Sequence, residues 1–193
     1  MTIPLDQQLS FLREIDALKS VIRASPLINQ SRKENAAEHS WHLAMYALIL
    51  AEHSNEKINV DRVIRMLLIH DIVEIDAGDT PIHGNSLNAS TQVAKERKAA
   101  DRIFGMLPPA QAASLKNLWM EFEAATSDDA KFAKSLDRLQ PLVHNIETDG
   151  GTWKDADVSF QQVLDRYGPP IESGSSTLWN CAKRFVKSYY RNS

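Results

Sequence analysis

The sequence predicts an all-α protein, a single domain built as a bundle of several helices. Apolar residues recur at three- and four-residue steps along most of the chain, which is the spacing of one helix face. No segment shows the sustained apolar–polar alternation of a half-buried strand, and no internal repeat or low-complexity linker divides the chain. A length of 193 residues is enough for one hydrophobic core. We therefore expect residues 1–193 to form one domain.

Composition places the chain among soluble globular proteins, with 43% hydrophobic and 24% charged residues. The net charge of -3 gives no reason to expect a nucleic-acid duplex as partner, whereas a small phosphorylated molecule needs only a local cation. The lone Cys181 excludes an intrachain disulfide and suits a reducing compartment. The N-terminus has no secretory pattern, and the longest apolar segments are too short to cross a bilayer. We expect a cytoplasmic protein that does not enter a membrane.

Two helices are expected before residue 54. The first carries an apolar stripe at helical spacing, formed by Leu9, Leu12, Ile15, Leu18 and Ile22. The second begins near Asn35, because Asn35 and Glu38 have the spacing of a capping box, in which each side chain satisfies a backbone donor. It includes His39 to His53, and its apolar face is formed by Leu43, Tyr46, Ala47 and Leu50.

The middle of the chain predicts three more helices separated by turn formers. One runs from about Val60 to Ile75 and stops at Gly78, a residue suited to helix termination. Residues 78–86 are expected to form a loop. The next helix runs from about Ser90 to Leu107 and ends at two prolines. The one after it has an apolar face of Leu115, Leu118, Trp119 and Phe122.

The last third predicts a long helix followed by two shorter ones. Helical spacing continues from Asp128 to Asn145, where Pro141 should end or kink the helix because it lacks an amide donor. Two segments of helix breakers, 150–151 and 168–170, separate the final two helices. The aromatic anchors of these helices are Phe160 and Tyr167, then Trp179, Phe185 and Tyr189.

The doublet His70-Asp71, followed by Glu74, is the most informative feature of the chain. It places one imidazole and two carboxylates within about one helical turn. Partly buried carboxylates that lie close together are costly unless a cation or hydrogen bonds compensate them. A divalent ion would compensate them and would also activate water. The working hypothesis is a metal-dependent hydrolase with its metal site between helices.

Two other predicted helices offer ligands of the same kind, His39 and Asp137. With the doublet they give two imidazoles and two carboxylates, a set that suits Mn, Co, Fe, Zn or Mg. Helix packing could bring all four into the bundle interior. Structural readings stay open: His42 rivals His39 as a ligand, each histidine could be a hydrogen-bonded core residue, and Asp137 could pair with Arg138.

Three further residues are candidates for the chemistry. Glu74 projects from the same helix face as His70, where it could orient or deprotonate water. Asp79 follows the helix end, where it could contact substrate or a leaving group. Arg23 could point a planar donor fork at a phosphate. Each has a structural alternative, as a solvated carboxylate, a turn former or a helix C-terminal charge.

These residues resemble the HD superfamily of metal-dependent phosphohydrolases, whose pattern is a His, a His-Asp doublet and a distant Asp. Four segments of this chain carry the pattern in order: 32–40, 70–74, 78–81 and 134–137. The set looks most like the 5′-deoxynucleotidase branch, which removes phosphate from deoxyribonucleoside monophosphates. Segments 118–123 and 130–134 are also similar to that branch, and the resemblance covers roughly Arg23 to Arg166.

The resemblance implies that one divalent ion is held by His39, His70, Asp71 and Asp137. It implies that Glu74 assists the water nucleophile, that Arg23 orients the phosphate, and that Asp79 contacts the nucleotide. The substrate-binding residues it implies are Arg23, His39, Asp71, Asp79, Thr80, Pro81, Ile82 and Asp137. The branch is typically dimeric, so a homodimer is implied as well.

We expect a 5′-nucleotidase that hydrolyses (deoxy)ribonucleoside monophosphates with metal-activated water. Close relatives carry a tryptophan shortly after the arginine, associated with deoxyribose preference, whereas Ala24-Ser25-Pro26 follow here, so the choice of sugar stays open.

Two alternative functions also stay open. One is an HD phosphohydrolase acting on an alarmone, a triphosphate or a cyclic nucleotide, whose dinuclear forms need extra ligands; His42 and His83 are near the motif but lack an evident partner set. The other is a non-catalytic helical protein that binds a nucleotide or a metal.

Overall fold

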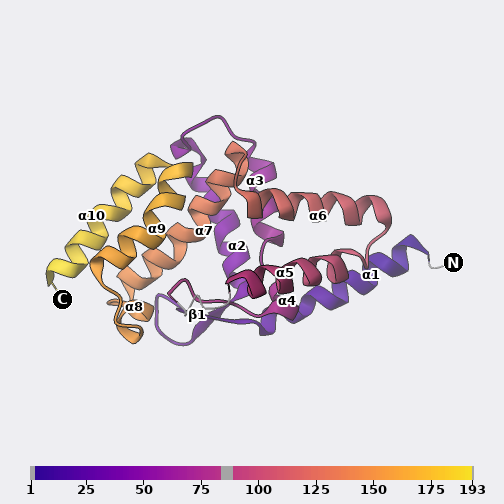
Figure 1. Cartoon of the computed structure of the whole chain (residues 1–193), viewed down its shortest axis with the longest axis horizontal. Coiled ribbons are helices and arrows are strands. Elements are labelled where there is room, and N and C mark those ends of the chain that lie inside the picture. Colours follow the sequence, from indigo (N-terminus) through magenta and orange to yellow (C-terminus); the bar gives the residue numbers. More distant parts are fainter. Residues whose placement is uncertain (1–2, 84–88, 193) are drawn as a thin grey trace.

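The computed structural model describes residues 3–83 and 89–192, and helices make up most of this described chain (Figure 1). The all-α prediction is confirmed, apart from one small strand pair. The central helix is α7 (Asp128–Glu147), which packs against α2 (Ala36–Leu50), α3 (Val60–Ile69) and α9 (Phe160–Gly174). The terminal helices α1 (Pro4–Glu14) and α10 (Ser176–Asn192) lie at opposite ends of the long axis (Figure 1).

The first predicted helix is wrong beyond residue 14. Helix α1 ends at Glu14, a 3₁₀ helix η1 (Ile15–Ser20) follows, and Ile22 begins a strand. The tighter winding of a 3₁₀ helix, about three residues per turn, takes the apolar stripe off one face. Of the stripe, Leu18 is buried but Leu9, Leu12 and Ile22 are exposed, and Phe11 supplies the buried contact of α1 instead.

A short hairpin corrects the prediction that no strand is present. Strand β1 (Ile22–Pro26) pairs antiparallel with β2 (Lys33–Asn35), with Ile22 opposite Asn35 and Pro26 opposite Lys33. The residues that β1 buries are Arg23 and Ser25, while Ile22 faces solvent. Because the polar residues point inward, the usual apolar pattern of a strand is inverted, which conceals the hairpin in the sequence.

The capping box at the start of α2 is confirmed. The Asn35 side chain accepts a hydrogen bond of 3.0 Å from the Glu38 backbone N–H, and Glu38 Oε2 accepts one of 3.2 Å from the Asn35 N–H. Helix α2 ends at Leu50, and a 3₁₀ turn η2 (Ala51–His53) follows. This cap fixes where α2 begins, and therefore where His39 lies on its first turn.

The predicted helix from Val60 to Ile75 is interrupted. Helix α3 ends at Ile69, residues 70–73 form a turn, and α4 (Glu74–Ala77) is one short turn of helix. Within the turn, hydrogen bonds join residues three apart, as from the Glu74 N–H to the Asp71 carbonyl at 2.9 Å. Gly78 ends α4 with a φ of +77°, which favours glycine. The doublet therefore lies in a turn rather than within a helix.

The breaks around α5 (Ala89–Phe104) and α6 (Pro109–Ala124) fall near the predicted positions. Pro109 occupies the first turn of α6, where a missing N–H costs nothing. Residues 84–86 of the predicted loop lie outside the described residues.

The predicted helix from Asp128 to Asn145 is confirmed as α7, which does not end at Pro141 but continues to Glu147. The prediction that residues 168–170 separate the last two helices is wrong. Gly168, Pro169 and Pro170 lie inside α9, and the boundary with α10 is at Ser175 instead. Added Cβ atoms at Gly168 would come within 2.8 Å of the Trp179 ring, so the glycine allows α9 and α10 to pack closely. A five-residue helix, α8 (Gly151–Asp155), begins within the predicted break at 150–151.

Buried side chains form two clusters. The larger lies among α2, α3, α7, α9 and α10, and the smaller lies among α1, η1, α5 and α6. Ile69, the last residue of α3, packs against both. The doublet His70-Asp71 directly follows Ile69 and therefore lies where the two clusters meet. Within the described residues, no helix is both long enough and apolar enough to traverse a bilayer.

Candidate metal centre and active site

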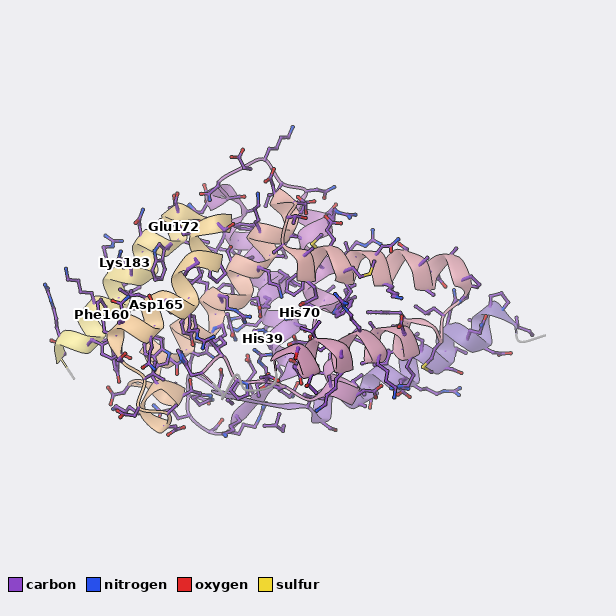
Figure 2. The ribbon with its side chains drawn as sticks, in the orientation of Figure 1. His39, His70, Phe160, Asp165, Glu172 and Lys183 are labelled. Carbon is purple, nitrogen blue, oxygen red and sulfur yellow. The ribbon has the colours of Figure 1, made fainter. Side chains whose placement is uncertain are left out.

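Three of the four predicted metal ligands, His39, His70 and Asp137, come together in the structure, and Asp71 lies beside His70. His39 projects from α2, His70 and Asp71 from the turn after α3, and Asp137 from α7. Asp137 Oδ1 lies 3.1 Å from His39 Nε2 and 3.5 Å from His70 Nε2. His70 Nε2 lies 2.9 Å from Asp71 Oδ1. Figure 2 shows His39 and His70 near the middle of the long axis, between the two ends of the molecule.

Both imidazoles are oriented as metal ligands usually are. His70 Nδ1 lies 2.8 Å from the Leu67 carbonyl, and His39 Nδ1 lies 3.1 Å from Gln140 Oε1, so each can donate its Nδ1–H to an oxygen. That bond directs Nε2 toward the carboxylates, where it can bind an ion once it is deprotonated. His70 Nε2 is buried, and although it lies 2.9 Å from Asp71 Oδ1, the two atoms are not aligned for a hydrogen bond.

The carboxylates of Asp71 and Asp137 stabilise positive charge between the predicted ligands. Burial opposes protonation of His70, but Asp71 and Asp137 outweigh it and raise its pKa to about 10. Burial also opposes the ionised form of Asp137, yet Arg138, His39 and His70 hold its pKa well below its usual range. Two carboxylates and two imidazole nitrogens that together favour a cation are the donor set that a divalent transition metal binds. The residues present therefore fit such an ion.

Arg23 lies against the ligands, although it comes from strand β1. Its Nη1 donates a hydrogen bond of 2.7 Å to Asp71 Oδ2 and lies 3.7 Å from Asp79 Oδ1. Burial disfavours the charge of the guanidinium, but Asp71 and Asp79 more than offset this and raise its pKa. Its Nε lies 3.8 Å from Glu34 Oε2 and makes no hydrogen bond among the residues described.

Glu74 and Asp79 lie beside this group. Burial and the charge of Asp71 raise the pKa of Glu74 to about 9, and its Oε2 has no hydrogen-bond partner in the described chain. Burial also raises the pKa of Asp79, while Arg23 opposes that shift. Among the described residues, the only ion pair of these two carboxylates is the buried contact of Asp79 with Arg23. Positive charge placed near Asp71 would favour the ionised form of Glu74.

A cleft of about 890 Å³ opens over these residues. Its lining includes nearly all the predicted site residues: Arg23, His70, Asp71, Glu74, Asp79, Thr80, Pro81, Ile82 and Asp137. His39 is fully buried and does not line the cleft, so it can reach an ion but not a substrate in the cleft. The volume is within the usual range of about 300–1,000 Å³ for small-molecule sites.

Sequence reasoning missed several residues of the site. Basic side chains on the cleft wall add positive charge for an anionic ligand: Lys33, Lys95, Lys134, Arg138 and Arg166. Gln140 supports His39 from one turn beyond Asp137 on α7, and Glu34 lies 3.5 Å from His39 Nδ1. The spacing of Asp137 and Gln140, three residues on one helix, is the signal that could have identified the second residue.

A family model described as an HD domain matches residues 15–179 of the chain. A human protein named 5′-deoxynucleotidase HDDC2 is 31% identical over 140 residues, covering 72% of this chain and 67% of the relative. An Escherichia coli protein named 5′-deoxynucleotidase YfbR is 36% identical over 101 residues, covering 50% of this chain and 49% of the relative.

A solved structure from Magnetospirillum magnetotacticum, described as a predicted metal-dependent phosphohydrolase, superposes with a TM-score of 0.92. Its sequence is 52% identical, and the match covers 97% of this chain and 93% of that one. A Pyrococcus horikoshii structure has a TM-score of 0.62 at 19% identity and shares the fold.

Proposed function

Because this chain belongs to the HD domain family, we propose that it is a metal-dependent phosphohydrolase that releases phosphate from nucleoside 5′-monophosphates. The observation that carries this proposal is the convergence of His39, His70, Asp71 and Asp137 beside a cleft. The names of the human and E. coli relatives support a 5′-nucleotidase in particular.

We assign one divalent ion to the four ligands, with Mn, Co, Fe, Zn or Mg compatible with them. When bound, the ion supplies the positive charge that polarises a water molecule and offsets charge on the phosphoryl oxygens. His39 and His70 hold their Nε2 atoms toward it because Gln140 and the Leu67 carbonyl accept from the opposite nitrogens.

Three residues outside the ligand set carry out the remaining steps. Glu74, on the cleft wall, orients the attacking water and accepts its proton. Arg23 contacts the phosphate through the donors that Asp71 does not use, and the bond to Asp71 keeps the guanidinium in place. Asp79, with a raised pKa, gives a proton to the departing nucleoside oxygen. Phosphate and a nucleoside leave the site.

The cleft is proposed to hold the nucleoside beside the ligands. Thr80, Pro81 and Ile82 line the wall next to Asp79, and they would contact the sugar and base. Of the basic wall residues, Lys134 pairs with Glu123 and Arg138 with Asp137, so Lys33, Lys95 and Arg166 are the ones proposed to attract an anionic substrate. Ala24 lies on the same wall, directly after Arg23, and Ala24-Ser25-Pro26 contain no tryptophan, so both ribose and deoxyribose fit the proposal.

Phosphate release from a panel of nucleotides tests this function. Purified protein is given ribo- and deoxyribonucleoside mono-, di- and triphosphates, an alarmone and cyclic nucleotides, with Mn²⁺, Co²⁺, Mg²⁺ and Zn²⁺ in turn. Release from 5′-monophosphates, abolished by a chelator, is expected. Faster release from another class would favour the other HD phosphohydrolases, and binding without release would favour a non-catalytic role.

We further propose that residues 1–193 form one cytoplasmic domain that acts as a homodimer and binds neither membranes nor a nucleic-acid duplex. The contact of Ile69 with both buried clusters supports one domain. A single free cysteine, Cys181, supports a reducing compartment. A dimer is supported by exposed apolar residues at helical spacing on α2: Trp41, Met45, Leu48 and Ile49.

A further inference from the structure

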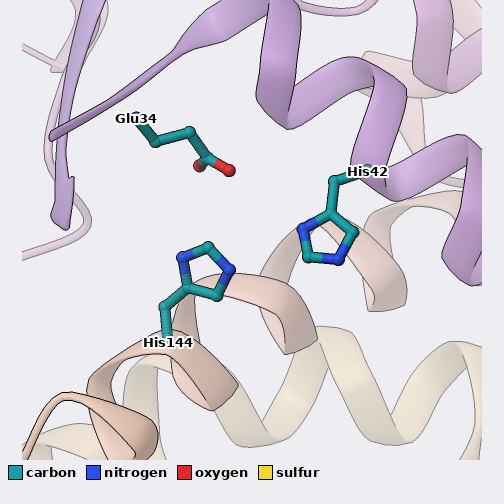
Figure 3. Close-up of side chains that lie close together, drawn as sticks. All are labelled: Glu34, His42 and His144. Atoms are coloured by element: carbon teal, nitrogen blue, oxygen red, sulfur yellow. The ribbon is translucent and has the colours of Figure 1, made fainter. Parts of the chain in front are cut away.

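A second group of potential ligands lies behind the first. The polar ends of Glu34, His42 and His144 point toward a common centre, and they come from β2, α2 and α7 (Figure 3). One oxygen or nitrogen atom of each lies within 4.8 Å of the others. Glu34 and His144 are each only 2% exposed, and His42 is half-buried. In the sequence, His42 lacks an evident partner set.

The side-chain amide nitrogen of Gln140 lies between the three residues but cannot donate a hydrogen bond to each of them. Gln140 Nε2 lies 2.8 Å from Glu34 Oε1, 3.1 Å from His144 Nε2 and 3.4 Å from His42 Nδ1. A primary amide has two hydrogens, so it can donate to only two of three acceptors. The other carboxylate oxygen, Glu34 Oε2, is buried and has no hydrogen-bond partner among the described residues.

His144 is held in the tautomer that a ligand needs. Its Nδ1 lies 3.1 Å from the Pro26 carbonyl, which accepts the Nδ1–H. The Nε2 lone pair therefore faces the centre of the cluster, with an oxygen acceptor behind the ring as in most histidine metal sites. Arg23 Nε, 3.8 Å from Glu34 Oε2, offsets part of the cost of burying this carboxylate, whereas Glu34 Oε1 accepts only from the neutral Gln140 amide among the hydrogen bonds of the described residues.

We propose that Glu34, His42 and His144 form a second divalent-cation site, selective for ions such as Zn²⁺ or Co²⁺. Two imidazoles and one carboxylate are a ligand set found at zinc sites. A cation at the centre satisfies all three acceptors at once, which the Gln140 amide cannot. The side chain of Gln140 rotates away when the ion enters, and the three ligands close around it.

The second site is linked to the first through His39. Gln140 Oε1 lies 3.1 Å from His39 Nδ1, and Glu34 Oε2 lies 3.5 Å from the same nitrogen. When Gln140 turns away, Glu34 becomes the acceptor for the His39 Nδ1–H, with its other oxygen on the second ion. A carboxylate acceptor makes the imidazole a stronger ligand than an amide does. This link, but not the site itself, rests on the proposed function of His39.

Metal content provides the first test. Wild-type protein and the variants His42→Gln and His144→Gln are dialysed to equilibrium against Zn²⁺ or Co²⁺, and bound metal per chain is measured. The matched control is His53→Gln, which removes a histidine from η2, outside both clusters. Loss of one equivalent in the two cluster variants, but not in the control, is expected. Equal metal content in all four proteins would overturn the proposal.

A second measurement does not depend on how the variants fold. Crystals of the wild-type protein grown with Zn²⁺ are measured at the zinc absorption edge. An anomalous peak between Glu34, His42 and His144, with Gln140 displaced, is expected. Peaks elsewhere, with the Gln140 amide still at the centre, would refute the second site. Neither measurement needs turnover, so a protein that proved inactive on nucleotides would contradict the proposed function and leave this result standing.

Discussion

The Nη1 atom of Arg23 lies 2.7 Å from Asp71 Oδ2, which joins strand β1 to the turn after α3 at the wall of the cleft. Both residues are buried, at 8% and 7% exposure. The pair places a guanidinium beside a proposed metal ligand, so one residue would neutralise Asp71 and contact the substrate phosphate. A lysine there keeps the charge but loses the planar fork.

We expect Arg23→Lys to raise KM and to lower kcat/KM by about ten- to a hundredfold, because the remaining point charge cannot hold Asp71 and a phosphate together. Steady-state kinetics on a nucleoside monophosphate measure this. The control is Arg32→Lys, since Arg32 is exposed and pairs with Glu38. Similar kinetics for the two variants would show that Arg23 does not contact the phosphate.

We expect Glu74→Gln to lower kcat by about 10²–10⁴-fold, the usual contribution of a general base, while the metal content stays at the wild-type level. In contrast, Asp71→Ala should lose both metal and turnover. The matched control is Asp76→Asn, on the same turn of helix but paired with Arg102 at the surface. Wild-type turnover in Glu74→Gln would remove the proposed role.

A larger side chain after Arg23 should change the choice of sugar. Ala24→Trp fills part of the cleft wall, so we expect kcat/KM for ribonucleoside 5′-monophosphates to fall more than that for the deoxy substrates. The ratio of the two constants is the measurement, and the control is Ala24→Leu. An unchanged ratio in the tryptophan variant would mean that this wall does not contact the sugar.

The exposed apolar stripe on α2 predicts the subunit interface. Ile49 is 68% exposed, and a lysine there would be buried without a partner in a dimer. We expect Ile49→Lys to yield a monomer in light scattering at micromolar concentration. The control is Leu12→Lys, on the exposed part of α1. A dimer that persists in Ile49→Lys would place the interface elsewhere.

Acid should destabilise the fold through His144. Burial lowers the pKa of this imidazole, so below about pH 6.5, the usual value for histidine, the unfolded chain binds a proton more readily than the folded one. The contribution to stability is complete above that pH and is lost as the pH falls further. We expect the free energy of unfolding of His144→Gln to decrease less steeply than that of wild type between pH 7.5 and 5. Urea denaturation with a chelator present measures both slopes, and parallel curves would contradict the expectation.

Local signals were the most predictable from the sequence. The capping box of Asn35 and Glu38 depends on residues three apart, so it determines the start of α2 whatever surrounds it. The resemblance to the HD superfamily also predicted the meeting of His39, the doublet and Asp137, whereas their spacing alone left structural alternatives open.

Features that depend on packing were not predictable. The hairpin turns Arg23 inward because Asp71 and Asp79 hold it there, and both come from another part of the chain. Pro169 and Pro170 lie inside α9, where Gly168 fits against the Trp179 ring and tertiary contacts override the local preference. The partners of His42 are likewise 8 and 102 residues away, beyond the reach of any local pattern.

Helix α7 supplies Asp137 to one ligand group, His144 to the other, and Gln140 between them. All three side chains project from one face of this helix. Deleting a single residue between Ser127 and Asp137 would turn them together by about 100°, since one helical residue corresponds to that rotation. Evolution can therefore vary exposed positions such as Asp128, but the number of residues in this part of the helix is constrained by both centres at once.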